Sequence, residues 1–442
     1  MRVKTIQRCP ECNQEYFRGY WCKPCNSTRL KNEFDKWTSG NDTIDKFIQD
    51  SQLNNDDFHK LIEWIPFDRF QDIKEMAKGG FGTIYHAKWI AGPIRKWDAE
   101  NQKWKRSDKS KQVALKKFDG IGDINEDFLN ELAIHLRTMD INTNTYTFVP
   151  FYGITRDPET LKYMMVLKYL KDGNLRNHLN NNFNNIKWEK KLSYLKDLSF
   201  RFTKIHKLGI IHQDFHPGNI LSSNFDYSDL HISDFGLSKS IEKNVENPQK
   251  RTVFGVLPYI APEVLCGEEY TKAADVYSFA IITYEIITGL LPYPDVPHDE
   301  ELALKICSGL PKIPFYTPKL IARIVMRCWD SRVTYRPTFD ELEIELRGYF
   351  NDYLVKYLMH KNNNEIAMQI KEAEEFSKKQ ETPTTTKTPL DYKTHPQAIY
   401  TSRLLNFSNL PKPVNEPNFE KKLEEISGSI SHIITNNDIG DF

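Results

Sequence analysis

The stretch Ile210-Ile211-His212-Gln213-Asp214-Phe215-His216-Pro217-Gly218-Asn219-Ile220-Leu221 decides the fold of this chain. Within it, Asp214 and Asn219 stand five residues apart, and Asp234-Phe235-Gly236 follows twenty residues after Asp214. A lone Asp-Phe-Gly is common as a turn. Its place after the longer stretch, with apolar residues two and four positions ahead of it, argues against a chance turn. We therefore expect two carboxylates and an amide to act together.

A glycine-rich segment, Lys78-Gly79-Gly80-Phe81-Gly82, lies far upstream of that stretch. Glycines allow backbone amides to approach phosphate oxygens closely. A single glycine-rich turn is weak support, because many hairpins carry one. Here an aromatic residue precedes Gly82 and the strand-forming Thr83-Ile84-Tyr85 follows it, which favours a loop folded over a nucleotide. Ala77 occupies the first of the three glycine positions expected in such a loop.

Lys116 ends the predicted strand Val113-Ala114-Leu115-Lys116 and would, alone, be a solvated strand-edge lysine. Fifteen residues later, Glu131 lies in a predicted helix with an apolar face. Glu131 can pair with Lys116, which leaves the ammonium to hold the α and β phosphates of a nucleotide. Glu126 is the competing glutamate, but it precedes the established part of the helix.

These residue types, in this order, are the ones that phosphoryl transfer requires. The reaction needs a phosphate cradle, a lysine held by a glutamate, two magnesium ligands and a carboxylate at the acceptor hydroxyl. We predict Asp214, Lys116 and Glu131 as catalytic residues, with Asp214 accepting the proton of the hydroxyl. Asn219 and Asp234 are the predicted Mg²⁺ ligands, and ATP is the predicted co-substrate.

The apolar, strand-like residues 163–167 precede Lys168-Tyr169-Leu170, which we interpret as the hinge beside an adenine ring. The contacts expected there are the Lys168 carbonyl and the Leu170 amide. Both are backbone groups, so their side chains carry little information.

With three further motifs, the chain resembles the tyrosine kinase-like group of eukaryotic protein kinases over about residues 66–350. The motifs are Ala261-Pro262-Glu263, Asp275-Val276-Tyr277-Ser278-Phe279, and Cys328-Trp329 separated by six residues from Arg336-Pro337. The resemblance implies an α+β, bilobal protein kinase fold: a small antiparallel β lobe with one helix, and a large, mainly α-helical lobe. It also implies that Glu263 pairs with Arg336. The implied nucleotide-binding residues are Ala77, Gly79, Gly82, Ile84, Ala114, Lys116, Lys168 and Leu170.

The catalytic loop departs from the family pattern at several positions. Gln213 replaces the arginine that binds a phosphorylated activation loop, so control through Thr252 is not expected. His216 stands where serine/threonine kinases usually carry a lysine, and Val256 follows Gly255 where they carry a threonine. Serine/threonine specificity is still favoured, because the loop lacks the arginine that tyrosine kinases place there.

Two functions from different classes remain open at this point. One is an active kinase that phosphorylates protein substrates. The other is a pseudokinase scaffold that binds partners without phosphoryl transfer. Such scaffolds usually lose the lysine, the catalytic aspartate or the metal aspartate, and this chain keeps all three, at Lys116, Asp214 and Asp234.

Two CxxC motifs separated by nine residues predict a zinc site near the N-terminus, with the ligands Cys9, Cys12, Cys22 and Cys25. Two unrelated redox pairs, or chance clustering, are the competing interpretations. We expect residues 1–30 to form a knuckle on which the kinase lobes do not depend. A structural or protein-binding role is favoured over nucleic-acid contact, because the surrounding basic residues are scattered. This knuckle, a Trp-rich insert and a Pro/Asn-rich tail together resemble a large family of fungal kinases.

The remaining chain divides by composition. Residues 31–64 are predicted as a helical linker with a helix over 41–53, and residues 65–354 as the kinase domain, with lobes at 65–167 and 171–354. The insert 92–110 is predicted as a hairpin on the small lobe. The polar tail 355–442 is predicted to be mostly disordered, with a short helix over 419–426.

The 442-residue chain carries 60 basic and 60 acidic residues, which gives no support for nucleic-acid or anionic-membrane binding. Its N-terminus lacks the apolar stretch of a signal peptide. The most apolar window, 279–291, is shorter than the ~20 residues that span a bilayer, and predicts a buried helix. We expect an intracellular protein located in the cytoplasm, with the nucleus as the alternative location.

Overall fold

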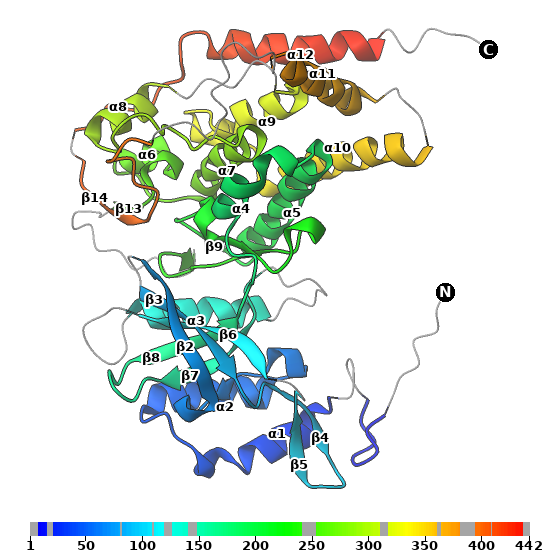
Figure 1. The fold of residues 1–442 in the computed structure, drawn as a ribbon, viewed down its shortest axis with the longest axis vertical. Helices are drawn as coiled ribbons and strands as arrows, with labels where there is room; N and C mark the ends of the chain where they lie inside the picture. The colour runs from blue at the N-terminus through cyan, green and yellow to red at the C-terminus, as the bar shows by residue number, and fades with distance from the viewer. Residues whose placement is uncertain are drawn as a thin grey trace. The chain divides into compact units, whose positions relative to one another are not determined.

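The computed structural model describes residues 8–15, 21–79, 82–107, 110–118, 126–139, 148–240, 253–309, 317–359, 364–380, 394–407 and 409–435. The chain forms two compact units, Met1–Leu170 and Lys171–Phe442. The first is built around a β-sheet and the second is mainly helical (Figure 1).

The first unit contains a six-stranded sheet in the order β1-β7-β8-β6-β3-β2. All of its pairs are antiparallel except β1 with β7, which is parallel. The strands are β1 Glu63–Trp64, β2 Phe70–Gly79, β3 Gly82–Trp89, β6 Lys111–Lys117, β7 Phe151–Arg156 and β8 Tyr163–Lys168. The strands predicted at Thr83-Ile84-Tyr85, at Val113-Ala114-Leu115-Lys116 and over 163–167 are therefore present.

The sheet buries one of its faces in an apolar cluster that includes Trp89, Val113, Leu115 and Val166. Side chains alternate between the two faces of a strand, so Ala114 and Lys116 lie on the opposite face from Val113 and Leu115. This alternation leaves a second face on which polar chemistry can be placed.

Helix α3 (Glu126–Met139) packs on the first unit's sheet through aromatic contacts. Phe128 meets Phe118 edge to face at 5.2 Å between ring centroids. His135 lies 5.4 Å from Phe151 of β7. Both contacts fix the rotation of α3, and the fully buried Leu132 and Glu131 share its inner side.

The N-terminal segment folds against the insert hairpin. Helices α1 (Lys23–Lys31) and α2 (Asp42–Asn54) precede the hairpin of β4 (Ile94–Asp98) and β5 (Lys103–Arg106). The Asn41 side chain caps α2 by accepting from Thr43 N at 2.9 Å. Both the helix predicted over 41–53 and the hairpin predicted over 92–110 are confirmed.

A shared apolar cluster joins the cysteine module to the rest of the first unit, and the expectation that the kinase lobes do not depend on the module stays a prediction. Trp21 is 2% exposed and packs with Leu61 and with Ile94 of the hairpin. Its ring stacks on Trp104 at 5.8 Å. Buried aromatic area of this kind stabilises the fold more than the few apolar contacts that a 30-residue knuckle can form by itself.

The second unit is built on long helices. They are α4 Leu175–Asn182, α5 Trp188–Lys207, α6 Pro262–Leu265, α7 Lys272–Thr288, α8 Glu300–Ser308, α9 Lys319–Cys328 and α10 Phe339–Met359. Helix α7 is buried on nearly all sides, which explains the apolar window around 279–291. Among the described residues, no helix is long and apolar enough to cross a bilayer.

Short elements complete the second unit. Two small antiparallel pairs join β9 (Ile210–Ile211) to β12 (Lys239–Ser240) and β10 (Ile220–Ser222) to β11 (Leu230–Ile232). One-turn 3₁₀ helices occur in both units, at Phe34–Lys36, Phe58–Lys60, Phe67–Arg69, Phe183–Asn185, Pro217–Asn219, Phe225–Tyr227, Leu257–Tyr259 and Val333–Tyr335.

The polar tail is more ordered than its composition predicts in the segments that the structure describes. It forms α11 (Glu365–Gln380), β14 (Arg403–Leu405) and α12 (Phe419–Thr435), and β14 pairs with β13 (Val253–Gly255) (Figure 1). The helix predicted over 419–426 is present and longer than expected. Scattered apolar side chains such as Ile366, Leu405 and Phe419 are buried and supply the packing that average composition conceals. Residues 381–393, with most of the Thr/Pro run, lie outside the described residues.

We predict that Gly82→Ala destabilises the first unit. An added Cβ would lie 2.1 Å from the Lys117 carbonyl oxygen, and the Gly82 φ of +146° already disfavours other residues. Strain of this kind costs of order 1–3 kcal/mol in the free energy of unfolding. Gly79→Ala is the control, because nothing lies within 4 Å of a Cβ there. Thermal unfolding of both variants checks the expectation, and an equal loss in both would contradict it.

Candidate active site

Lys116 and Glu131 form a buried ion pair in the first unit. Lys116 Nζ lies 2.5 Å from Glu131 Oε2, and the two residues are 5% and 1% exposed. The predicted pairing is thus found, between the end of β6 and the second turn of α3. Removing either charge would leave the other buried without a partner, which is strongly destabilising. The pair therefore fixes the position of α3 relative to β6.

His135 borders the same carboxylate, with its Nε2 4.0 Å from Glu131 Oε1. Burial, and to a lesser degree the charge of Lys116, lower the pKa of His135 to about 3. The imidazole is therefore neutral at physiological pH. It does not compete with the ammonium of Lys116 for the charge of Glu131.

Strand register places several predicted nucleotide-binding residues on one face of the sheet. Ile84 of β3 pairs with Lys116 of β6 and with Ala77 of β2. Ala114 of β6 pairs with Leu167 of β8. Paired residues point to the same side of a sheet, so Ala77, Ile84, Ala114 and Lys116 share the face opposite the apolar cluster.

The glycine segment forms the end of the β2–β3 hairpin, where Gly79 pairs with Gly82. Gly80 and Phe81 lie outside the described residues. Gly82 is required by the close approach of the Lys117 backbone, a reason that the sequence did not reveal, whereas Gly79 borders open space. Lys168 ends β8 and donates its backbone N–H to Pro150 O at 2.8 Å, and Leu170 is buried shortly after it.

In the second unit, the buried carboxylate of Asp275 holds the loop that carries Asp214. Asp275 accepts from the backbone N–H of His212 at 3.0 Å and of Gln213 at 3.2 Å. Its Oδ2 also lies 2.9 Å from His206 Nε2. This frame allows Gln213 to adopt a positive φ of 69°, an uncommon conformation for a residue with a side chain.

Asp214 is 4% exposed and forms hydrogen bonds on the Oδ2 side of its carboxylate. Asn219 Nδ2 donates to Asp214 O at 2.9 Å and to Oδ2 at 3.2 Å. The Ser402 hydroxyl of the tail donates to the same Oδ2 at 2.6 Å. Asp214 Oδ1 is buried and accepts no hydrogen bond from the described residues.

The environment of Asp214 favours its ionised form. Burial by itself would raise the pKa of this carboxyl, but His216 and the hydrogen bonds from His216 and Ser402 bring it below the usual value. A group with a lowered pKa stays ionised at neutral pH and loses its charge only on acidification. Asp214 is therefore able to accept a hydrogen bond, and then a proton, from an alcohol.

Asn219 and Asp234 lie at the same end of the β10–β11 hairpin. Ile220, directly after Asn219, pairs with Ile232. Ser233 N donates to Asn219 O at 3.0 Å, which fixes the residue preceding Asp234. Asp234 itself has a positive φ of 63°, and the following Phe235 is fully buried. The two predicted metal ligands are thus neighbours in the fold.

A buried bidentate ion pair joins Glu263 to Arg336. The two nitrogen–oxygen distances are 2.7 and 2.8 Å, and Arg336 Nε also donates to Asp330 O at 2.8 Å. The resemblance implied this pair, and the contact is present. It anchors α6 to the loop that precedes α10. Val256 is buried next to β13, whereas Thr252 lies outside the described residues.

The four N-terminal cysteines form one cluster, with all Sγ atoms within 4.8 Å of one another. Cys9 and Cys25 are 3.9 Å apart, and Cys12 and Cys22 are 3.4 Å apart. Four thiolates at ~2.3 Å from a tetrahedral zinc ion would be ~3.8 Å apart, so the donor set fits such an ion. These separations are too long for disulfides, which argues against two redox pairs.

Residues 70–346, well over half of the chain, match the family described as "Protein tyrosine and serine/threonine kinase". The chain belongs to this protein kinase family. The sheet of the first unit and the helices of the second are accordingly the small and large lobes of a kinase domain.

Among curated relatives, "Probable serine/threonine-protein kinase gdt2" of Dictyostelium discoideum is 26% identical over 306 residues, covering 68% of this chain and 16% of the relative. "Probable serine/threonine-protein kinase drkC" of the same organism is 31% identical over 236 residues, covering 52% of this chain and 30% of the relative. The chain therefore spans less than a third of the length of these relatives.

Three features of the site were missed by sequence reasoning. The framing role of Asp275 could have been found, because a carboxylate at the start of a largely apolar, buried helix needs buried donors. The contact of His216 with Asp214, at 3.6 Å, depends on loop geometry. The approach of Ser402 to Asp214 spans 188 residues and leaves no signal in either local sequence.

We predict that Cys12→Ser removes stoichiometric zinc and weakens the shared cluster around Trp21. Metal analysis tests the first part, and the fluorescence of the Trp21–Trp104 stack tests the second. Cys266→Ser, a thiol outside the cluster, is the control and should retain zinc. Full zinc content in Cys12→Ser, or no zinc in the wild type, would contradict the prediction.

We predict that Glu131→Gln lowers both stability and ATP turnover, because the charge of Lys116 loses its balancing carboxylate. Removing one partner of a buried pair typically costs about 3–5 kcal/mol in unfolding free energy. The double variant Lys116→Met/Glu131→Gln should recover part of the stability but none of the turnover. Urea unfolding and ATPase rates measure the two effects, with Glu126→Gln as the control. Wild-type turnover in Glu131→Gln would refute the role of the pair.

Proposed function

We propose that the chain transfers the γ-phosphate of Mg·ATP to serine or threonine hydroxyls of proteins. The observation that carries this proposal is the arrangement at Asp214: a buried, ionised carboxylate, held by Asn219 and hydrogen-bonded to an alcohol. A carboxylate in this state can orient a hydroxyl and take its proton as the oxygen attacks phosphorus.

Two residues of the second unit are suited to hold magnesium. Asn219 gives its amide nitrogen to Asp214, which leaves its carbonyl oxygen, a ligand preferred by hard cations, on the other side of the amide. Asp234 follows on the adjacent strand end and offers a carboxylate. Bound Mg²⁺ would offset the charge of the transferred phosphoryl group.

In the first unit, Lys116 is proposed to bind the α and β phosphates while Glu131 fixes its position. The face that carries Ala77, Ile84 and Ala114 is proposed to receive the adenosine, with the backbone of Lys168 and Leu170 at the adenine edge. Small side chains at 77 and 114 leave room for a ring. These roles rest on register and burial within that unit.

We propose membership of the tyrosine kinase-like group and of the fungal family with the zinc knuckle. The Glu263–Arg336 contact supports the group, because Arg336 belongs to its late motif. The four-thiol cluster and the Trp97/Trp104 hairpin support the family. Proposed partners are protein substrates, together with a protein that contacts the zinc module. Clustered reduced thiols and ATP dependence both suit the cytoplasm.

The pseudokinase alternative keeps some support from this chain's departures at Ala77, Gln213 and His216. Against it stand the intact Lys116–Glu131 pair and the ionised Asp214. A scaffold has no need of either. We therefore rank catalysis ahead of scaffolding.

We predict that Asp214→Asn abolishes phosphoryl transfer to an added protein while ATP affinity stays within a few-fold of the wild type, because Asp214 serves the acceptor and not the nucleotide. Asp234→Asn should weaken Mg·ATP binding and turnover together, since it removes a metal ligand. Transfer of label from ATP to the added protein measures turnover, and titration with Mg·ATP measures nucleotide affinity. Asp229→Asn, five residues upstream of Asp234, is a control for loss of a nearby charge. If Asp214→Asn retained most of the wild-type rate of phosphoryl transfer, the proposal would be wrong.

A further inference from the structure

We propose that Ser402 is a phosphorylation site that the chain modifies in cis, presented to Asp214 by the chain's own tail. This proposal rests on the proposed function and adds a modification site to it. Its central observation is the hydrogen bond from the Ser402 hydroxyl to Asp214 Oδ2 at 2.6 Å. That oxygen belongs to the carboxylate assigned to accept the proton of a substrate hydroxyl.

A second hydrogen bond fixes the orientation of the Ser402 hydroxyl. His216 Nδ1 accepts from the backbone N–H of Gly218 at 3.0 Å, which leaves the ring proton on Nε2. His216 Nε2 lies 3.2 Å from Ser402 Oγ and therefore donates to it. The hydroxyl thus accepts from His216 and donates to Asp214, with one lone pair left for attack on phosphorus.

The backbone around Ser402 is bound as a substrate strand would be. Directly after Ser402, Arg403, Leu404 and Leu405 form β14, which pairs antiparallel with Val253–Gly255 of β13. Leu405 is 4% exposed, whereas Leu404 is 47% exposed. An added strand gains affinity from main-chain hydrogen bonds and selectivity from alternate side chains. Here Leu405 is the anchoring side chain.

Residues ahead of Ser402 are bound as firmly. The guanidinium of Arg176 donates to Tyr400 O at 2.7 Å and lies 5.4 Å from the Tyr400 ring centroid. The Tyr400 hydroxyl donates to Pro292 O at 2.8 Å. Each contact positions the segment two residues before the hydroxyl.

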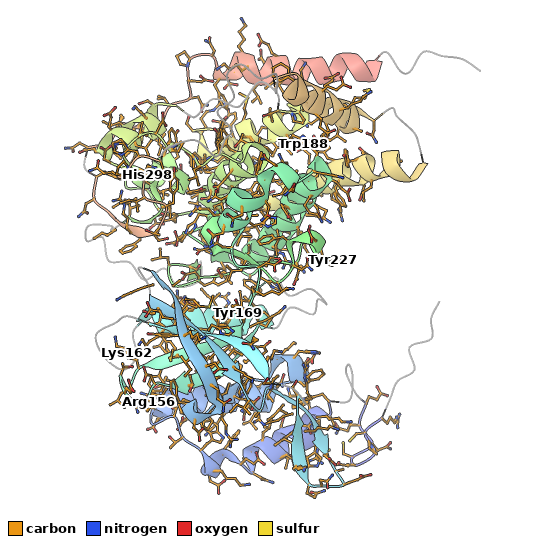
Figure 2. All side chains as sticks on the ribbon, in the orientation of Figure 1. Arg156, Lys162, Tyr169, Trp188, Tyr227 and His298 are labelled. Atoms are coloured by element: carbon orange, nitrogen blue, oxygen red, sulfur yellow. The ribbon has the colours of Figure 1, made fainter. Side chains whose placement is uncertain are left out.

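His298, labelled in Figure 2, holds the tail at a further point. Its Nδ1 lies 2.9 Å from Ile399 O, and its backbone N–H donates to Gln397 O at 3.0 Å. The Arg403 side chain returns to donate to His298 O. The segment that carries Ser402 is therefore fixed on both sides of this residue. The position of the hydroxyl at Asp214 depends on several contacts and not on one.

The reaction balances with ATP as the co-reactant. Ser402 Oγ forms a bond to the γ-phosphorus of ATP, and the bond from that phosphorus to the β,γ-bridging oxygen breaks. The electron pair leaves with ADP, and the hydroxyl proton passes to Asp214 Oδ2. The products are ADP and phosphoserine, whose charge of about −1.5 to −2 would lie against the Asp214 carboxylate and favour release of β14.

The test incubates the phosphatase-treated full chain with Mg·ATP and maps phosphate by mass spectrometry. We expect phosphate at Ser402, formed at a first-order rate that does not change with protein concentration. Thr401, the adjacent exposed hydroxyl, should acquire none. Ser402→Ala should lose this phosphate, and Asp214→Asn should show none.

Two matched variants of β14 test the docking of the strand. Leu405→Arg should slow phosphorylation of Ser402 about tenfold, in proportion to the fall in the docked population. Leu404→Arg, an exposed position in the same strand, should leave the rate unchanged. Equal rates in both variants would overturn the proposal.

Phosphorylation of dephosphorylated casein separates this proposal from the proposed function. If casein is phosphorylated while Ser402 is not, the proposal is overturned and the kinase assignment stands. A Ser402 rate that rises with protein concentration would likewise overturn modification in cis. If neither the wild type nor Leu405→Arg phosphorylates casein or Ser402, both proposals fail.

Discussion

The loop that carries Asp214 depends on one buried carboxylate, that of Asp275. Asp275 accepts hydrogen bonds from the backbone of His212 and Gln213 and from the His206 ring. Because a polar group this deeply buried must be satisfied by hydrogen bonds, the loop has little freedom to rearrange. The left-handed conformation of Gln213 and the position of Asp214 both follow from that frame. The buried pair of Arg336 and Glu263 acts in the same way, because it fixes α6 to the loop that precedes α10. Buried polar contacts outside the proposed site thus hold the segments of the second unit in place.

The proposed catalytic residues could be predicted from the sequence because phosphoryl transfer limits which side chains are usable and in what order. In the structure, the alternation of side chains along β6 then places Ala114 and Lys116 on the same face of the sheet. Gly82 shows where this reasoning stops. Its φ and its clearance from the Lys117 carbonyl are structural requirements, although its sequence context suggested a phosphate contact. Long-range pairings, such as Leu405 with Val253, could not be predicted, because average composition hides isolated apolar anchors in a polar segment.

The insert hairpin gives the cysteine module a place in the first unit. Trp21 and Trp104 stack, Arg29 lies 4.7 Å from the centroid of the Trp97 ring, and Arg106 reaches Glu63 at 2.5 Å. Glu63 belongs to β1, which is the edge strand of the main sheet. The cysteine module is therefore connected to that sheet through packed side chains. The insert that the sequence predicts as a hairpin is, in this structure, also the connecting element.

Under the proposed function, the covalent tie between β14 and the rest of its unit would set a threshold for any other substrate. A tethered segment occupies its site at an effective concentration in the millimolar range, without needing high intrinsic affinity. A diffusing peptide with only micromolar abundance would rarely displace it. Proteins that also bind a second surface of the chain would compete better, because that contact raises their own effective concentration at the site. Selectivity would then reside in docking contacts distant from the phosphorylated residue, and short sequence motifs around that residue would be poor guides to the partners of this kinase.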